Sequence, residues 1–101
     1  MRIDFLRTGG FAGTRLQATI RTETLPPAEA AELQELVAAA NFFRLPRTAS
    51  GSGSAADQFT YRIIVVAGLL RRRTIQTTDA AAPPALRPLI QRLTQWARAA
   101  R

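Results

Sequence analysis

The chain has 101 residues, enough for one domain with a single hydrophobic core. It contains no cysteine and no histidine, which excludes disulfides, thiolate nucleophiles, and the commonest zinc ligands and acid–base groups, so we expect no enzymatic activity, no cofactor and no bound metal. The formal net charge is +7 and all fourteen basic residues are arginine, which suits either a nucleic-acid or acidic partner or, as we favour, a solvated basic surface.

No apolar run approaches the roughly 20 residues that a membrane-spanning helix needs. The first residues lack the basic-then-apolar layout of a signal peptide, because Asp4, Arg7 and two glycines interrupt it. The sequence therefore predicts a cytoplasmic protein without a membrane partner, which we expect to be a monomer when free.

The first two elements are predicted to be strands. Residues 2–7 alternate between apolar and polar side chains, with Ile3 and Phe5 on the apolar face. Residues 14–22 alternate in the same way. Two alternating runs joined by a glycine-rich segment are typical of a β-hairpin.

A helix is predicted to begin at Pro26 and Pro27, because proline suits the first helical turn, where its missing N–H would have no partner. The helix is predicted to end at Asn41, a residue type that tolerates the left-handed conformation. The apolar positions predicted to face the core here and just after the helix are Leu33, Leu36, Val37, Ala40, Phe42, Phe43 and Leu45.

The middle of the chain contains one low-complexity stretch, "RTASGSGSAAD" at residues 47–57, which we predict to be a flexible loop. A strand is predicted at residues 58–68. It is central in the sheet, since both of its faces become apolar toward the end. A returning strand is predicted at residues 71–78 with Ile75 pointing inward, followed by Asp79 as a cap or turn residue.

The last segment predicts an amphipathic helix that begins at Pro83 and Pro84. Its apolar positions are Leu86, Leu89, Ile90, Leu93, Trp96 and Ala97. The element order is thus ββαββα, which predicts an α+β fold with a four-stranded antiparallel sheet and two helices packed on one face. We expect a single domain over residues 1–101.

One candidate site is a basic sheet face for a phosphate backbone, formed by Arg71–Arg73 with Arg62 and Arg15 on neighbouring strands. A sheet that binds nucleic acid also needs exposed aromatic side chains on which bases can stack. The aromatic residues predicted to lie in the core are Phe5, Phe42, Phe43, Phe59, Tyr61 and Trp96, which leaves Phe11 alone. We therefore favour a solvated arginine-rich face, and nucleic acid is disfavoured as a partner.

The other candidate is the segment "RTGGFAGTR", which joins the first two predicted strands. Its glycine spacing matches neither a P-loop nor a dinucleotide-binding motif, and no helix N-terminus follows to receive a phosphate. Two interpretations of Phe11 remain. Its side chain either folds back over the end of the core or serves as an apolar anchor for a pocket in a partner protein.

Four segments in order resemble the emfourin family, small protein inhibitors of thermolysin-like metallopeptidases such as protealysin. They are "RTGGFAG", "LPPAEAAELQELVAAANFFRLP", "DQFTYRI" and "DAAAPPALRPLIQRL", and the resemblance runs from Arg2 to about Trp96. This chain departs from the family in the serine- and glycine-rich loop at 47–57 and in the basic "LLRRRT". The resemblance implies a non-enzymatic protein that blocks a peptidase and has no small-molecule substrate.

The resemblance implies a thermolysin-like (protealysin-like) peptidase as the partner but does not say which residues contact it, so the site is inferred from the residues themselves, with a hairpin loop that enters the cleft. Such enzymes favour a large apolar residue just after the scissile bond, so the Gly10–Phe11 bond looks substrate-like. Asp57, or a carbonyl near it, is the rival contact, because carboxylate oxygens can approach a catalytic zinc. The predicted partner-binding residues are Gly9, Gly10, Phe11, Ala12, Gly13 and Asp57. The alternatives are a small basic module that binds nucleic acid or an acidic protein, and an accessory domain in a larger assembly.

Overall fold

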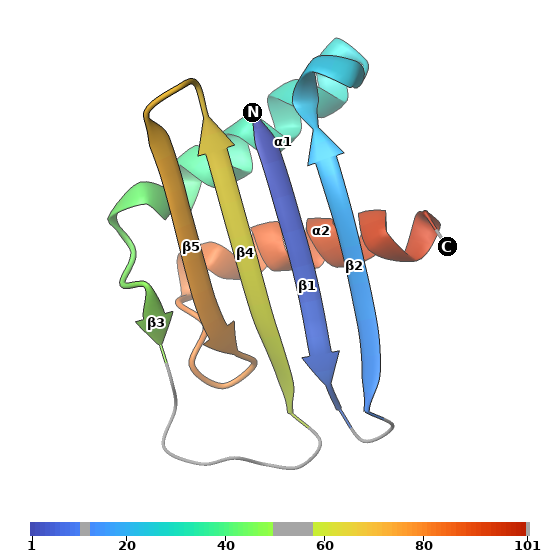
Figure 1. Cartoon of the computed structure of the whole chain (residues 1–101), viewed down its shortest axis with the longest axis vertical. Coiled ribbons are helices and arrows are strands. Elements are labelled where there is room, and N and C mark those ends of the chain that lie inside the picture. The colour runs from blue at the N-terminus through green and yellow to red at the C-terminus, as the bar shows by residue number, and fades with distance from the viewer. Residues whose placement is uncertain (11–12, 50–57, 101) are drawn as a thin grey trace.

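The computed structural model describes residues 1–10, 13–49 and 58–100. Two hairpins, each followed by a helix, make up the fold (Figure 1). The elements are β1 (Arg2–Gly9), β2 (Thr14–Arg21), α1 (Pro27–Ala39), β3 (Thr48–Ala49), β4 (Phe59–Ala67), β5 (Arg71–Thr78) and α2 (Arg87–Ala99), with short 3-10 helices at Thr22–Thr24, Phe42–Arg44 and Pro84–Leu86.

The strands form one sheet in the order β2-β1-β4-β5-β3. The four long strands are antiparallel: β1 pairs with β2 from Arg2↔Arg21 to Gly9↔Thr14, and with β4 along its other edge. The central position predicted for β4 is confirmed, because it lies between β1 and β5. Its apolar residues on the open face, Ile64 and Val66, are half-buried between the side chains of the two flanking strands.

The short strand β3 corrects the prediction that all of residues 47–57 form a loop. Thr48 and Ala49 pair in parallel with Gln76 and Thr77 of β5, and the Gln76 N–H donates to the Arg47 carbonyl oxygen at 2.8 Å. Two residues are too few to carry an alternating pattern, so only tertiary contact reveals this strand.

Both helices cover the same face of the sheet (Figure 1), which confirms the predicted α+β architecture. Between them lies the core, where Ile3, Ile63 and Ile75 are completely or almost completely buried on adjacent strands. α1 and α2 bury Leu33 and Leu93 against this layer. The alternation seen in the sequence therefore separates a covered face from an open face in every long strand.

The helix ends follow their local sequence. Pro27 opens α1, and Asn41 has a φ of 54° just after it, as predicted. The predicted start of the last helix at Pro83 and Pro84 is wrong, because Pro84–Leu86 form a 3-10 helix and α2 begins at Arg87. The aromatic pair that follows divides: Phe42 is buried, whereas Phe43 is only half-buried against the core. In the part of the chain that the structure describes, neither helix has the length and apolarity needed to cross a bilayer.

The two ends of the sheet carry different turns (Figure 1). The β1–β2 connection and the start of β4 lie at one end, and the β4–β5 turn lies at the other. The first end holds Gly9, Gly10 and Gly13, the predicted partner-binding residues that the structure describes.

Candidate functional site

The glycines of the β1–β2 connection each meet a different requirement. Gly9 and Gly10 have φ values of +96° and +77°, which residues other than glycine rarely adopt. A Cβ on Gly10 would also lie 2.5 Å from Cε1 of the Phe59 ring, whereas one on Gly13, with φ +60°, would meet nothing within 4 Å. Gly10 is therefore required for both its backbone conformation and its contact with Phe59.

Backbone hydrogen bonds tie this connection to the start of β4. Gly9 pairs with Phe59 at the end of the β1–β4 ladder, and the Gly10 N–H donates to the Gln58 carbonyl oxygen at 3.2 Å. The Gly13 N–H donates to the Gly10 carbonyl oxygen, also at 3.2 Å. The glycine connection and the residue that follows Asp57 are thus fixed side by side, which the sequence alone could not establish.

The Phe59 ring packs directly against Gly10. The half-buried ring lies under the Arg7 guanidinium, with the Arg7 Cζ 4.0 Å from the ring centre, and its centre is 6.5 Å from that of Tyr61. A cation on an aromatic face is a favourable contact that also restricts the ring. The prediction that Phe59 belongs to the core is therefore refined, since its ring reaches the end of the sheet and supports the turn.

Asp79, which directly follows β5, is hydrogen-bonded to β4 at the same end of the sheet. Its carboxylate accepts hydrogen bonds from the Phe59 N–H at 2.9 Å and from the Tyr61 hydroxyl at 2.7 Å. Its own N–H donates to the Phe59 carbonyl oxygen at 3.2 Å. The predicted turn residue is thus a brace that holds β4 in place beneath the glycine connection, and charge-assisted bonds of this kind are among the stronger ones.

This brace changes the acidity of Tyr61. Burial, followed by the hydrogen bond to Asp79 and its negative charge, raises the pKa of Tyr61 from 10.0 to about 12, although the nearby Arg7 opposes the rise. Between these values the unfolded chain has released the phenol proton and the folded chain retains it. The contribution of this group to stability is complete below pH 10 and is lost as the pH rises toward 12.

We expect Asp79→Asn to lower the pKa of Tyr61 toward its ordinary value, and Arg7→Gln to raise it further, because the two charges act in opposite directions. Tyr61 is the only tyrosine, so tyrosinate absorbance against pH follows this residue alone. A pKa that does not change in Asp79→Asn would contradict the brace.

The predicted basic sheet face is wrong in part, because β5 divides the arginine cluster between the two faces. Arg73 pairs with Val65 and Arg71 with Ala67, on the face that the helices cover. There the Arg71 Cζ lies 4.1 Å from the ring centre of Phe43, and Arg73 donates to the Leu45 carbonyl oxygen. The arginines on the open face are Arg2, Arg15, Arg21, Arg62 and Arg72.

No aromatic ring lies exposed on the open face in the parts of the strands that the structure describes. The aromatic residues of β1, β4 and the 3-10 helix after α1 all lie on the covered face or at its rim. Among the described residues, the open side therefore offers arginine, threonine and a few aliphatic side chains, without a platform on which bases could stack.

Three of the predicted site residues, Phe11, Ala12 and Asp57, lie outside the described residues. The structure brings their neighbours together, with Gly10, Gly13 and Gln58 joined by hydrogen bonds. Sequence reasoning did not identify the supporting roles of Phe59, Tyr61 and Asp79. Their chain positions gave no signal, because contacts across a sheet depend on strand order.

The fold and the site together define a small α+β protein whose most constrained feature is a braced, glycine-rich hairpin end. The family model described as Emfourin matches residues 5–94 of the chain, and the chain therefore belongs to the Emfourin family. No curated protein and no solved structure matches it. The resemblance found in the sequence is confirmed at the level of the family.

Proposed function

We propose that the chain is a non-enzymatic protein inhibitor of thermolysin-like zinc metallopeptidases. The observation that carries this proposal is its membership of the Emfourin family over residues 5–94. The hydrogen-bonded hairpin end supports the same function. A segment whose backbone is already held in place loses little conformational entropy when it binds the cleft of an enzyme.

We propose further that residues 9–13 enter the active-site cleft, with Phe11 in the pocket that takes the residue after the scissile bond. The backbone contacts of Gly10 would keep this segment from being cut efficiently. Its φ of +77° is far from the extended conformation of a bound substrate, and its N–H is already bonded to Gln58. Binding without productive geometry blocks the enzyme.

Asp57 is the second proposed contact. It directly precedes Gln58 in the sequence, and the carbonyl oxygen of Gln58 accepts the Gly10 N–H. A carboxylate there could approach the catalytic zinc of the peptidase. The two segments would then act as one surface at this end of the sheet.

The experiment is a titration of a thermolysin-like peptidase with the purified protein, following hydrolysis of a peptide substrate. We expect a saturable loss of activity that higher substrate concentrations relieve, because the inhibitor and the substrate compete for one cleft. The absence of inhibition against several such peptidases would contradict the proposal. Inhibition that collapses as salt rises would favour a basic binding module instead, because contacts between charges are screened.

A further inference from the structure

The β4–β5 turn carries an apolar tip that the proposed inhibitor end does not use. Leu69 and Leu70 are 101% and 97% exposed, and they are the only large hydrophobic side chains exposed among the described residues. The turn projects beyond the sheet at the end opposite the glycine connection (Figure 1). Gly68, with φ +67°, allows the chain to reverse there.

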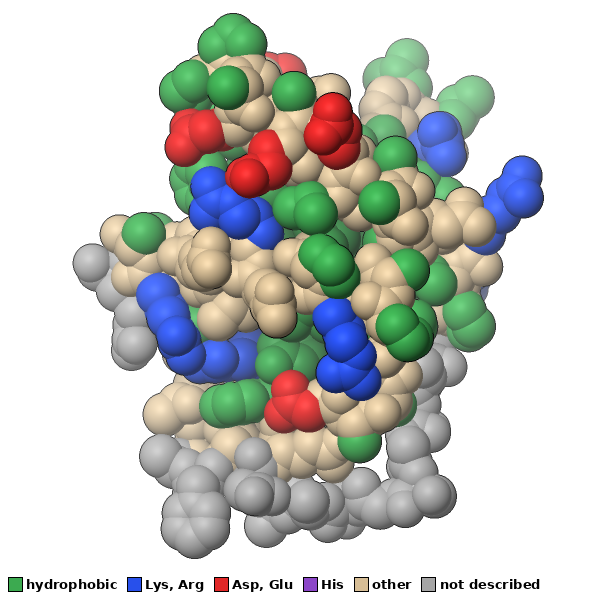
Figure 2. All heavy atoms as spheres, turned by 180° about the vertical axis from the view of Figure 1, so that it is seen from behind, with side chains coloured by type: hydrophobic (Ala, Val, Ile, Leu, Met, Phe, Trp, Pro, Cys, Tyr) green, Lys and Arg blue, Asp and Glu red, His purple; other side chains and the backbone are tan. Residues whose placement is uncertain are grey.

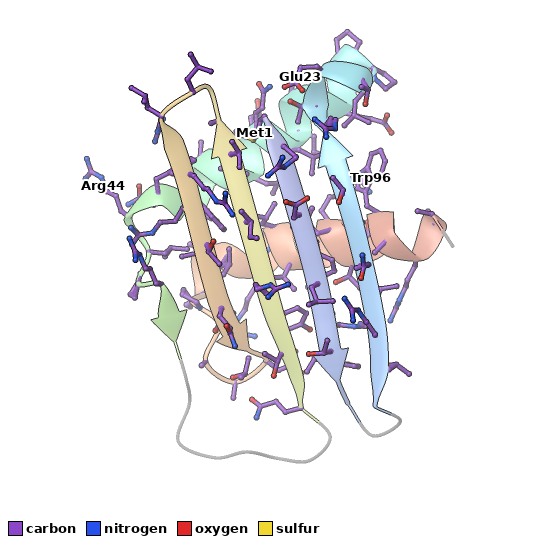
Figure 3. All side chains as sticks on the ribbon, in the orientation of Figure 1. Met1, Glu23, Arg44 and Trp96 are labelled. Carbon is purple, nitrogen blue, oxygen red and sulfur yellow. The ribbon has the colours of Figure 1, made fainter. Side chains whose placement is uncertain are left out.

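Two arginines follow this tip on opposite faces of β5. Arg72 lies on the open face opposite Val66, which in turn pairs with Arg2, whereas the exposed Arg71 lies on the covered side over the Phe43 ring. Arg44 is exposed and points outward beside the same edge of the sheet (Figure 3). The tip therefore combines aliphatic side chains with several guanidinium groups.

The acidic side chains lie elsewhere on this half of the molecule. They gather over the first part of α1 on the rear face (Figure 2), where the residues are Glu29, Glu32 and Glu35. Glu23 bonds the N-terminal amino group, and Asp4 lies 3.3 Å from Arg2. The basic residues next to the leucines in the chain, Arg71 and Arg72, therefore have no acidic neighbour in the turn itself.

We propose that the β4–β5 tip, Leu69 and Leu70 with Arg71 and Arg72, binds peripherally to an anionic lipid surface. Leucines inserted among acyl chains and arginines bonded to phosphate headgroups match the two layers of such a surface. A nucleic acid would gain nothing from two aliphatic side chains, and the positive charge around the tip disfavours a second copy of the chain. From the sequence we expect no membrane partner, because it contains no apolar run long enough to span a bilayer, but a peripheral contact needs no such run.

The tip contact is independent of the proposed inhibitor function. β4 has nine residues, so its two ends are about 26 Å apart at ~3.3 Å per residue. This separation exceeds the Debye length of about 8 Å at physiological salt, and charges at the two ends act separately. A lipid-bound molecule would keep its glycine connection free.

The test is co-sedimentation of the purified protein with vesicles of phosphatidylcholine and phosphatidylserine, and with vesicles of phosphatidylcholine alone. We expect binding to the mixed vesicles only. Replacing both leucines, Leu69→Ser with Leu70→Ser, should lower the partition coefficient by at least roughly a hundredfold. Because both side chains are fully exposed, the thermal unfolding of this variant and its inhibition of a peptidase should match the wild type.

Two arginine variants of equal net charge provide the matched control. Arg72→Gln lies beside the tip, and Arg15→Gln lies on the same open face at the other end of the sheet. We expect about a fivefold loss of vesicle binding for Arg72→Gln and no change for Arg15→Gln. No binding of the wild type to mixed vesicles would overturn the proposal and leave the tip to a protein partner. Equal losses for the two arginine variants, without an effect of the leucines, would also overturn it.

Discussion

Gly10→Ala is expected to lower the free energy of unfolding by about 3 kcal/mol, the sum of two separate costs. A side chain at a φ of +77° strains the backbone. The new Cβ would also lie 2.5 Å from the Phe59 ring, which is itself held between Arg7 and the sheet and cannot move freely. Chemical denaturation of the wild type and the variant measures the difference directly.

Gly13→Ala is the matched control, because Gly13 also has a positive φ, of +60°, but has no neighbour within 4 Å. Gly13→Ala should lower the free energy of unfolding by only about 1 kcal/mol, because only the strain of the left-handed conformation contributes. In a Phe59→Ala background, Gly10→Ala should cost less than it does in the wild type, since the ring with which the new Cβ clashes is then absent. Equal costs for Gly10→Ala and Gly13→Ala would show that the ring contact contributes nothing.

Phe11→Ala is expected to weaken inhibition of a thermolysin-like peptidase by at least about 2 kcal/mol, or roughly 30-fold in the inhibition constant. A single apolar anchor in a fitted pocket commonly provides that much of the binding free energy of a small inhibitor. The measurement is the inhibition constant of each variant against one peptidase. Circular dichroism and thermal unfolding show that the variant is folded.

Phe11→Leu provides the conservative comparison and should retain most of the inhibition, because leucine also fills an apolar pocket. Asp57→Asn tests the rival contact, since it removes the charge while nearly preserving the shape. An unchanged inhibition constant in a folded Phe11→Ala variant would leave Phe11 as a cover for the core. A large loss in Asp57→Asn alone would then assign the contact to the other segment.

The elements of the fold could be predicted because each has a local cause. Alternating side chains mark β1, β2 and β4, paired prolines stand at the start of α1, and Asn41 follows its end with a φ of 54°. These signals need no knowledge of distant parts of the chain. The ββαββα order then limits the architecture to a few arrangements, and the observed one places β1 rather than β2 beside β4.

The arginines show where this reasoning fails. Successive residues of a strand point to opposite faces, so "RRR" could not form one patch once β5 joined a sheet. The pairing of Arg73 with Val65 and of Arg72 with Val66 decides which guanidinium supports the chain after α1 and which faces solvent. A run of like charges in the sequence is therefore a poor guide to a charged surface on a sheet.

The sequence by itself determined the strands, the helices, the glycine-rich connection and the family resemblance, because these depend on residue type and short-range order. Only the tertiary structure decided that Gly10 lies against Phe59, that Asp79 braces Tyr61, and that the leucine tip lies at the opposite end. Strand register and strand order set these contacts. Each contact joins residues from different strands, so no single segment determines it. The glycine directly before Phe11 follows from this strand order, since the Phe59 ring of β4 occupies the space where a side chain on Gly10 would lie.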